Sequence, residues 1–525
     1  MKKPNDKKEA VIPEGHSLKT RRDFLSYGLV GSCAWVVAPD LLSVINSASA
    51  QATSCNQPIN NSAIPVLIID MAGGANIAGS NIMVGRSGGQ LDFLDTYKYL
   101  GLPSSFHPNQ SGMINNELGL AFHADSFMLR GIQAHTNATD RSKTDGMIVC
   151  TSVSDDTTNN QINPAYWLAD AGATGSLLKL VGSKGSSGPQ GVGPNGGYSV
   201  SPINSISKKS LAVEIAGVES LKTLVALNKI ESSLSASPDK VQKVLKTIQR
   251  LSESKLNSFS RRTLPQQIAD VVKCGIFLPQ QVVGGPVKPA HLDPMLDTAD
   301  ESNINAIFNL GSSAKDYSYI SKNLVGTILD GDTLAERKNQ ASVIKLLVDG
   351  YVGVGTIVLA GGDYHDKSAS TGNKYSFKVG KLIGRTISAF ARKGKPVMIH
   401  LITDGGVSFK DEDFDESVAG EGKYSWFADA GDRSATVTLV YNPTGKVGLR
   451  TPDRRQLGSY INGVSCNNTT ATICSSNPVN CAKVAVANYL ALSGRESQLP
   501  AIVGDNPFAR GTQQYEDYLF FESLV

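Results

Sequence analysis

The amino-acid sequence predicts an α/β protein with a mostly parallel sheet, and one strand–helix–strand unit between Tyr351 and Phe409 carries this prediction. Two apolar runs rich in β-branched residues, Val352–Ala360 and Val397–Thr403, have the composition of strands covered on both faces. Between them, apolar residues recur at helical spacing from about Ser376 to Arg392. This order is typical of two parallel strands joined by a crossover helix.

Acidic residues and one histidine follow the predicted strands. Asp70 closes an earlier apolar run, and the residues after the later strands are Asp363, His365, Asp366, Asp404 and Asp429. In an open parallel sheet, ligands bind beyond the carboxyl ends of the strands, so we expect these side chains to face one crevice. Carboxylates and imidazole bind divalent cations, and two such ions could clamp a phosphate or sulfate ester. Each Asp could equally be a turn residue or a helix cap.

The same patterns predict the other elements. The apolar segment Phe127–Ile132 is interpreted as a strand that leads into a polar loop at 135–146, which could hold a nucleophile, bind an anion or simply be solvated. The remaining expectations are strands at 64–70 and 435–441, helices at 335–347 and 483–492, a solvated acidic loop at 410–416, and a helical insertion at about 208–278 packed on the sheet.

The N-terminus carries an export signal. Thr20–Leu25 is a twin-arginine motif, a moderately apolar stretch follows it, and Ala48–Ala50 offers a small-residue cleavage site. A membrane anchor or a buried helix is the alternative interpretation. Gly28, Pro39 and Asp40 interrupt the apolar stretch, which makes it a poor spanning helix. We therefore expect residues 1–50 to be a signal peptide, a mature α/β domain at 51–525 without a transmembrane span, and a periplasmic or secreted location.

Composition and cysteine usage are consistent with an exported globular protein. The chain has 525 residues, 41% of them hydrophobic, and a net charge of +3, a balance that does not suggest a nucleic-acid partner. Of the seven cysteines, Cys33 lies in the leader, so an even number remains. Three of these lie in the C-terminal region at about 449–525, and in an oxidising compartment at least one disulfide is expected to clamp the loop around Asn467–Asn480.

Four motifs resemble those of a known family, the twin-arginine-exported domain of unknown function 1501, which belongs with the alkaline phosphatase and sulfatase-like folds. The resemblance covers Thr20 to about Gly448, and the matching segments are Leu67–Gly74, Leu359–His365, Ile402–Gly406 and Phe427–Gly431. It implies an alkaline-phosphatase-like three-layer α/β/α sandwich and a metal-dependent hydrolase of small-molecule or envelope esters.

The resemblance and the strand-end placement together suggest specific roles for individual residues. Asp70, Asp363, His365, Asp404 and Asp429 would bind a divalent metal, whose identity the sequence leaves open. Ser142 or Thr144 would be the nucleophile, with Lys143 near the anion.

Departures from the family motifs support a rival function. Asn76 stands where the family's first Asp is expected, Ser142-Lys143 replaces a Ser-His pair, and Ala430 replaces a His. These changes favour a non-catalytic descendant that acts as a binding or envelope-organising module. A third alternative is a protein whose loops bind an envelope polysaccharide, with the acidic segment Asp411–Glu416 involved.

Overall fold

The computed structural model describes residues 63–152, 162–175, 178–183, 213–215, 302–314, 332–362, 368–403, 405–462, 465–467, 472–504, 508 and 515–524. The predicted signal peptide, residues 1–50, lies outside these ranges, and so does most of the predicted helical insertion.

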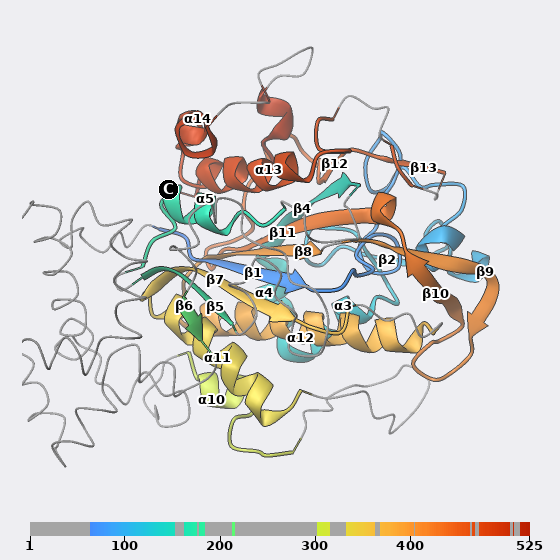
Figure 1. Ribbon diagram of the computed structural model, residues 1–525, viewed down its shortest axis with the longest axis horizontal. Coiled ribbons are helices and arrows are strands. Elements are labelled where there is room, and N and C mark those ends of the chain that lie inside the picture. Colours follow the sequence, from blue (N-terminus) through green and yellow to red (C-terminus); the bar gives the residue numbers. More distant parts are fainter. Residues whose placement is uncertain are drawn as a thin grey trace, which may run out of the picture.

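A mostly parallel sheet forms the centre of the described chain (Figure 1). Its strands, in spatial order, are β12 (Gln456–Leu457), β4 (Thr144–Thr151), β11 (Ser434–Tyr441), β8 (Val397–Thr403), β1 (Val66–Met71), β7 (Val352–Leu359), β5 (Leu178–Ser183) and β6 (Val213–Ile215). Within this sheet only β11 is antiparallel to its neighbours, β8 and β4. The predicted α/β class with a mostly parallel sheet is confirmed.

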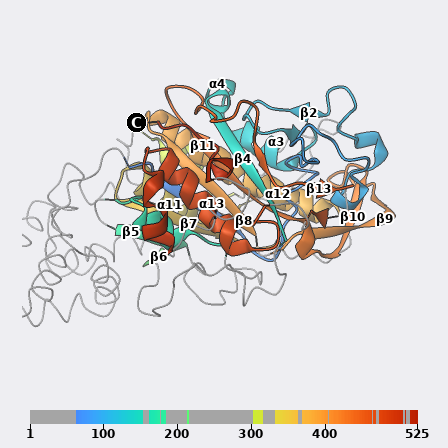
Figure 2. The same ribbon diagram turned by 90° about the horizontal axis from the view of Figure 1, so that it is seen from above.

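Helices cover both faces of the sheet (Figure 1). One face carries α3 (Phe127–His135), α4 (Ala138–Ser142), α10 (Ile304–Ile307), α11 (Leu334–Val348) and α12 (Ser370–Arg392). The other carries α5 (Ala165–Asp170), α13 (Pro478–Ala491) and α14 (Leu499–Val503). Figure 2, seen from above, confirms that α13 lies over the sheet.

Three short ribbons and several 3-10 helices complete the described structure. The ribbons are β2 (Ile114–Asn115) with β3 (Phe122–His123), β9 (Val407–Asp415) with β10 (Lys423–Asp429), and β13 (Tyr460–Ile461) with β14 (Ser465–Cys466). The 3-10 helices are Lys98–Leu100, Ser104–Phe106, Gly431–Arg433, Glu496–Gln498 and Tyr515–Tyr518. Both views place the β9–β10 ribbon at one end of the molecule (Figures 1 and 2).

The central strand β1 is buried along its whole length because both of its faces are covered. Leu67, Ile69 and Met71 pack in the core under α12, whereas Val66 and Ile68 pack in the core under α13. Side chains alternate along a strand, so the Asp70 side chain belongs to the α13 face.

The strand–helix–strand unit that the sequence predicted is confirmed as β7, α12 and β8. The helix begins at Ser370, earlier than the apolar pattern indicates, because its first turn is polar. Helix α11, predicted at 335–347, starts with a capping box in which Thr333 and Glu336 exchange hydrogen bonds. The predicted helix at 483–492 is α13, which begins earlier, at Pro478, directly after its cap residue Asn477.

Three predictions about secondary structure are wrong. The segment Phe127–Ile132 is the start of helix α3, because Ser126 caps it by accepting a hydrogen bond from the Leu129 amide at 3.1 Å. The acidic segment 410–416 is mostly strand β9, and not a loop, because it pairs with β10, while the side chains of Lys410 and Asp413 are solvent-exposed as expected. Within the predicted helical insertion, the described residues Val213–Ile215 form strand β6, which pairs with β5.

Helices α3 and α12 approach so closely that only glycine fits at the crossing. A Cβ atom on Gly380 would lie 2.0 Å from the Met128 carbonyl oxygen, and one on Gly131 would lie 2.3 Å from that of Phe377. A side chain at either position would push the helices apart. These glycines therefore set how closely α3 and α12 pack against each other.

A buried ion cluster joins the start of α11 to α12. One carboxylate oxygen of Asp332 lies 2.8 Å from Lys381 Nζ and 2.8 Å from Arg385 Nη1, and all three side chains are buried. Burial alone would raise the pKa of the Asp332 carboxyl, but Lys381 and Arg385 lower it to about 2. The cluster is a fixed ion pair network that orients the two helices.

Candidate functional site

Three parallel strands end together at one edge of the sheet, which we call the carboxyl edge. In the register of the sheet, Asp70 of β1 lies beside Val358 of β7 on one side and Ile402 of β8 on the other. The Asp70 carboxylate is completely buried, with 0% of its surface exposed. A carboxylate in such a position requires compensation by hydrogen bonds or a cation.

Backbone hydrogen bonds tie the loop after β1 to the loop after β7. The Ala72 amide donates to the Leu359 carbonyl oxygen at 3.1 Å, and the Gly362 amide donates to the Ala72 carbonyl oxygen at 3.0 Å. A Cβ on Gly362 would lie 2.6 Å from the carbonyl oxygens of Ala72 and Gly74, so the approach requires glycine. Gly362 directly precedes Asp363 in the sequence, and Asp363, His365 and Asp366 themselves lie outside the described residues.

The loop after β8 joins the same network. The Ala75 amide donates to the Gly405 carbonyl oxygen at 3.3 Å. The Thr403 hydroxyl lies 2.9 Å from the Gly405 carbonyl oxygen and 3.3 Å from that of Met71. Asp404 lies between Thr403 and Gly405 in the sequence and is itself outside the described residues.

The ribbon β9–β10 brings Asp429 to this edge. Asp429 ends β10, where it pairs with Val407, and the next amide, that of Ala430, donates to the Gly406 carbonyl oxygen at 2.9 Å. A Cβ on Gly406 would lie 2.5 Å from the Arg433 carbonyl oxygen, so this contact also requires glycine. The structure thus brings Asp429 next to the segment that follows Asp404.

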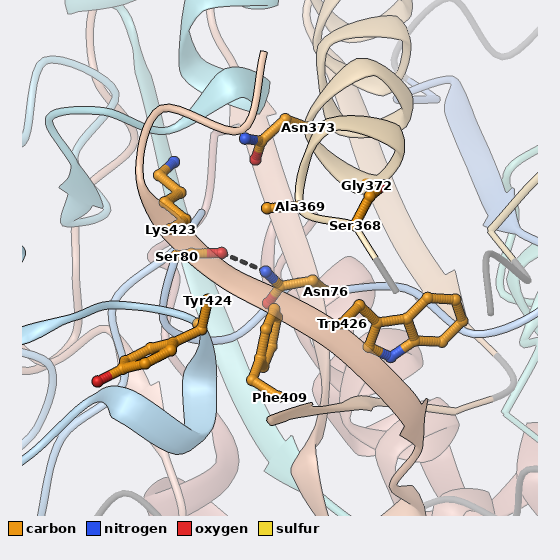
Figure 3. Close-up of a pocket in the computed structure, with 11 residues that line it drawn as sticks. Asn76, Ser80, Ser368, Ala369, Gly372, Asn373, Phe409, Lys423, Tyr424 and Trp426 are labelled. Atoms are coloured by element: carbon orange, nitrogen blue, oxygen red, sulfur yellow. Dashed lines mark hydrogen bonds between the residues drawn. The ribbon is translucent and has the colours of Figure 1, made fainter. Parts of the chain in front are cut away.

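A pocket of about 250 Å³, part of it open solvent, lies beside this network (Figure 3). Its lining comes from the loop after β1, from the start of α12 and from the β9–β10 ribbon. The lining residues are Asn76, Ser80, Gly101, Ser368, Ala369, Gly372, Asn373, Phe409, Lys423, Tyr424 and Trp426. Asn76 is among the residues that line this pocket, and its amide donates to the Ser80 hydroxyl.

The polar side chains of the pocket hold the surrounding backbone. Asn373 donates to the Ala419 carbonyl oxygen at 2.6 Å. The ammonium group of Lys423 donates to the Asp125 carbonyl oxygen at 2.8 Å and lies 5.1 Å from the centre of the Phe127 ring. Lys423 is buried, and these two contacts compensate its charge and join the ribbon to the start of α3.

The N-terminus of α12 beside this pocket is already occupied by a carboxylate of the chain. Asp415 accepts hydrogen bonds from the amides of Ala369 at 2.9 Å and Ser370 at 2.7 Å. Burial alone would raise the pKa of the Asp415 carboxyl, but hydrogen bonds from Ser417, Ser370 and Ala369 lower it. An internal anion thus satisfies the positive end of this helix.

The predicted nucleophile region lies at the opposite end of the sheet. Thr144, the first residue of β4, is level with Tyr441 of β11, which is in turn level with Val397 at the start of β8. Ser142 is exposed, and its hydroxyl donates to the Thr139 carbonyl oxygen at 2.8 Å. The structure therefore does not bring Ser142, Lys143 and Thr144 together with Asp70.

Sequence reasoning missed most of the pocket lining. Ser80 and Asn373 lie in segments without a strand-end pattern, so no local signal marked them. Tyr424 and Trp426 are two residues apart on β10, so their side chains lie on the same face of the ribbon. This spacing could have indicated a buried aromatic face. His400, on β8, was also not singled out, although an imidazole within an apolar run is a visible anomaly.

No protein-family model, curated protein or solved structure matches this chain. The structure itself defines a mixed α/β protein with a mostly parallel sheet and loop clusters at its carboxyl edge. Among the described residues, no three His, Cys, Asp or Glu side chains are grouped to hold a metal ion. Within the same ranges, no helix is long and apolar enough to cross a membrane.

Proposed function

We propose that this is an exported, periplasmic protein of the alkaline phosphatase and sulfatase-like class, which binds a divalent metal at the carboxyl edge and hydrolyses a phosphate or sulfate ester. One observation carries the proposal. Asp70, Asp429 and the neighbours of Asp363 and Asp404 lie in strands and loops that backbone hydrogen bonds join at one edge of the sheet. The spacing of these residues in the sequence did not by itself require them to lie at the same edge.

The donor set fits a divalent cation. Asp70 and Asp429 supply carboxylates, Asp363 and Asp404 would add two more, and His365 would add an imidazole. A bound cation would offset the charge of the buried Asp70 carboxylate and would supply a Lewis acid for a phosphoryl or sulfuryl oxygen. The chain's own contribution is a rigid set of loops, because glycines at Gly362 and Gly406 let backbones approach within hydrogen-bond distance.

A second function is supported by the position of Ser142. Since this serine lies at the amino end of β4, the carboxyl edge receives no nucleophile from the predicted region. The pocket beside the edge is lined by neutral amides, hydroxyls and aromatic rings together with one lysine. These features favour a non-catalytic module that binds a small molecule or an envelope component at the same edge.

Metal analysis of the chain purified without chelators tests the proposal. The expected content is about one or two equivalents of a divalent metal, lost in the double variant Asp363→Ala/His365→Ala. Asp170→Asn is the matched control, because Asp170 is an exposed carboxylate on α5 that pairs with Lys179, away from the carboxyl edge. Its metal content should equal that of the unmodified chain.

Turnover of nitrophenyl phosphate and nitrophenyl sulfate separates the two functions. Metal-dependent turnover that disappears with the double substitution supports the hydrolase. Stoichiometric metal without turnover of either ester supports the binding module. A folded wild-type chain that takes up none of zinc, manganese, calcium or iron refutes the metal site itself.

A further inference from the structure

Cysteine side chains gather where the end of β4 meets the turn before α13. Cys150 belongs to β4, Cys466 to β14 and Cys481 to the start of α13, while Cys474 lies in the preceding turn. All four are free thiols in the structure, and their exposed fractions are 0%, 2%, 1% and 0%, respectively. This cluster lies at the carboxyl end of β4, next to the 3-10 helix Gly431–Arg433 that follows Asp429, and nothing in the proposed function uses it.

The Cys481 side chain is hydrogen-bonded to the backbone of Cys474. The Cys481 thiol donates to the Cys474 carbonyl oxygen at 3.6 Å. Both side chains pack in the core under α13. Cys150 and Cys466 pack instead in the core under α12. The packing thus divides the cysteines into two pairs.

The turn that carries Cys474 is fixed in place, so this proximity does not depend on a loose segment. The Thr151 hydroxyl donates to the Cys474 carbonyl oxygen at 2.9 Å, and the Ser152 amide donates to the Ser475 carbonyl oxygen at 2.8 Å. Asn477 caps α13 by accepting a hydrogen bond from the Val479 amide. Both ends of the 474–481 segment are therefore held in position before any covalent bond forms.

We propose that Cys474 and Cys481 form a disulfide that fastens the turn before α13 to the first turn of that helix. The bond closes a short loop around the helix cap. It would hold α13 on the sheet even when the helix start opens. Cys466, whose thiol lies 4.0 Å from the Ser475 carbonyl oxygen, is the competing partner.

The reaction balances with a small-molecule disulfide such as oxidised glutathione as the oxidant. A cysteine thiolate attacks the glutathione disulfide, one glutathione thiolate leaves, and the second cysteine displaces the other glutathione from the mixed disulfide. The two protein thiols lose two protons and two electrons, which reduce the oxidant to two thiols. Burial raises the pKa of the Cys474 thiol well above its usual value, so the attack takes place before α13 covers the pair.

Differential labelling of the full chain tests the pairing. The chain is produced in cells with an oxidising cytoplasm, and free thiols are blocked with N-ethylmaleimide in denaturant. Oxidised thiols are then reduced and labelled with iodoacetamide. Trypsin cleaves after Arg455 and Lys483, which leaves Cys466, Cys474 and Cys481 on one peptide, so fragmentation must locate each label.

We expect the iodoacetamide label, which marks cysteines that were oxidised, on both Cys474 and Cys481 and to the same extent. The Cys466→Ser variant is the matched control and should show the same labels, whereas Cys474→Ser should leave Cys481 blocked by N-ethylmaleimide. Reduction of the wild-type chain should lower its Tm by roughly 2–3 °C, a shift absent from the Cys474→Ser/Cys481→Ser variant. N-ethylmaleimide on both residues of the wild-type chain, or a bond from either one to Cys466, overturns the proposal.

Discussion

His400 makes the stability of the fold depend on pH, and its environment gives the size of the effect. The imidazole lies on β8 inside the sheet, 1% exposed, with Nδ1 2.9 Å from the Thr438 hydroxyl. Burial lowers its pKa from 6.5 to about 4. The imidazole of the unfolded chain binds a proton as the pH falls below 6.5. In the folded chain the same imidazole binds its proton only near pH 4, because its pKa is depressed. Stability is therefore lost as the pH falls through that window.

The magnitude follows from the difference between the two pKa values. The shift is 6.5 − 4 = 2.5. At about 1.4 kcal/mol for each pH unit, complete titration of this residue would lower the free energy of unfolding by about 3.5 kcal/mol, and about 3 kcal/mol of that should be lost between pH 7 and pH 4, because the folded imidazole is only half protonated at pH 4. Other groups titrate in the same window, so the measurement must isolate the histidine.

Urea unfolding of the wild-type chain and of His400→Gln, at several pH values between 7.5 and 4, isolates it. Glutamine keeps a polar group near Thr438 but does not titrate. The stability of the wild-type chain relative to the variant should decrease by about 3 kcal/mol over this range. Two curves that stay parallel from pH 7.5 to pH 4 would show that His400 is not buried in its neutral form.

The same urea assay, at pH 7, checks three further predictions. Asp332→Asn should destabilise the fold by about 3–5 kcal/mol, since it leaves buried cations such as Lys381 without their carboxylate; no loss would contradict the ion cluster. Gly380→Ala should cost about 1–3 kcal/mol because the methyl group meets α3, whereas Gly311→Ala, which has nothing within 4 Å, should not; equal effects would argue against the close helix crossing. Thr333→Ala removes the cap of α11 and should lower the free energy of unfolding by about 1 kcal/mol. A loss smaller than that caused by replacing an exposed threonine inside a helix would contradict the capping role.

The strands were predictable wherever both faces are buried. Val352–Leu359 and Val397–Thr403 are near-continuous apolar runs because helices cover them on both sides. The same reasoning failed at Phe127–Ile132, since a short apolar run fits a buried helix as well as a buried strand. Ser126, directly before this apolar run, is a typical helix N-cap residue and could have identified the segment as a helix.

The candidate site was predictable only in the part that follows strand ends. Asp70 and Asp429 lie at the expected edge because their strands stop there. The predicted nucleophile region failed for a topological reason. Helix α3 replaces the expected strand, so the polar segment that contains Ser142 precedes β4 and lies at the start of the parallel strands. Strand direction depends on long-range pairing, and no local pattern encodes it.

The order of the strands explains why one edge collects these loops. The chain passes from β7 through α12 to β8, and in the sheet these two strands lie on opposite sides of β1. The loop after β1 is therefore placed between the loops after β7 and β8, as its hydrogen bonds to Gly362 and Gly405 show. A strand order that changes direction at a central strand opens a crevice at the carboxyl ends, which is where α/β proteins bind ligands. The geometry of the crossover thus favours this edge as the functional site, whichever of the two proposed functions the metal and turnover measurements support.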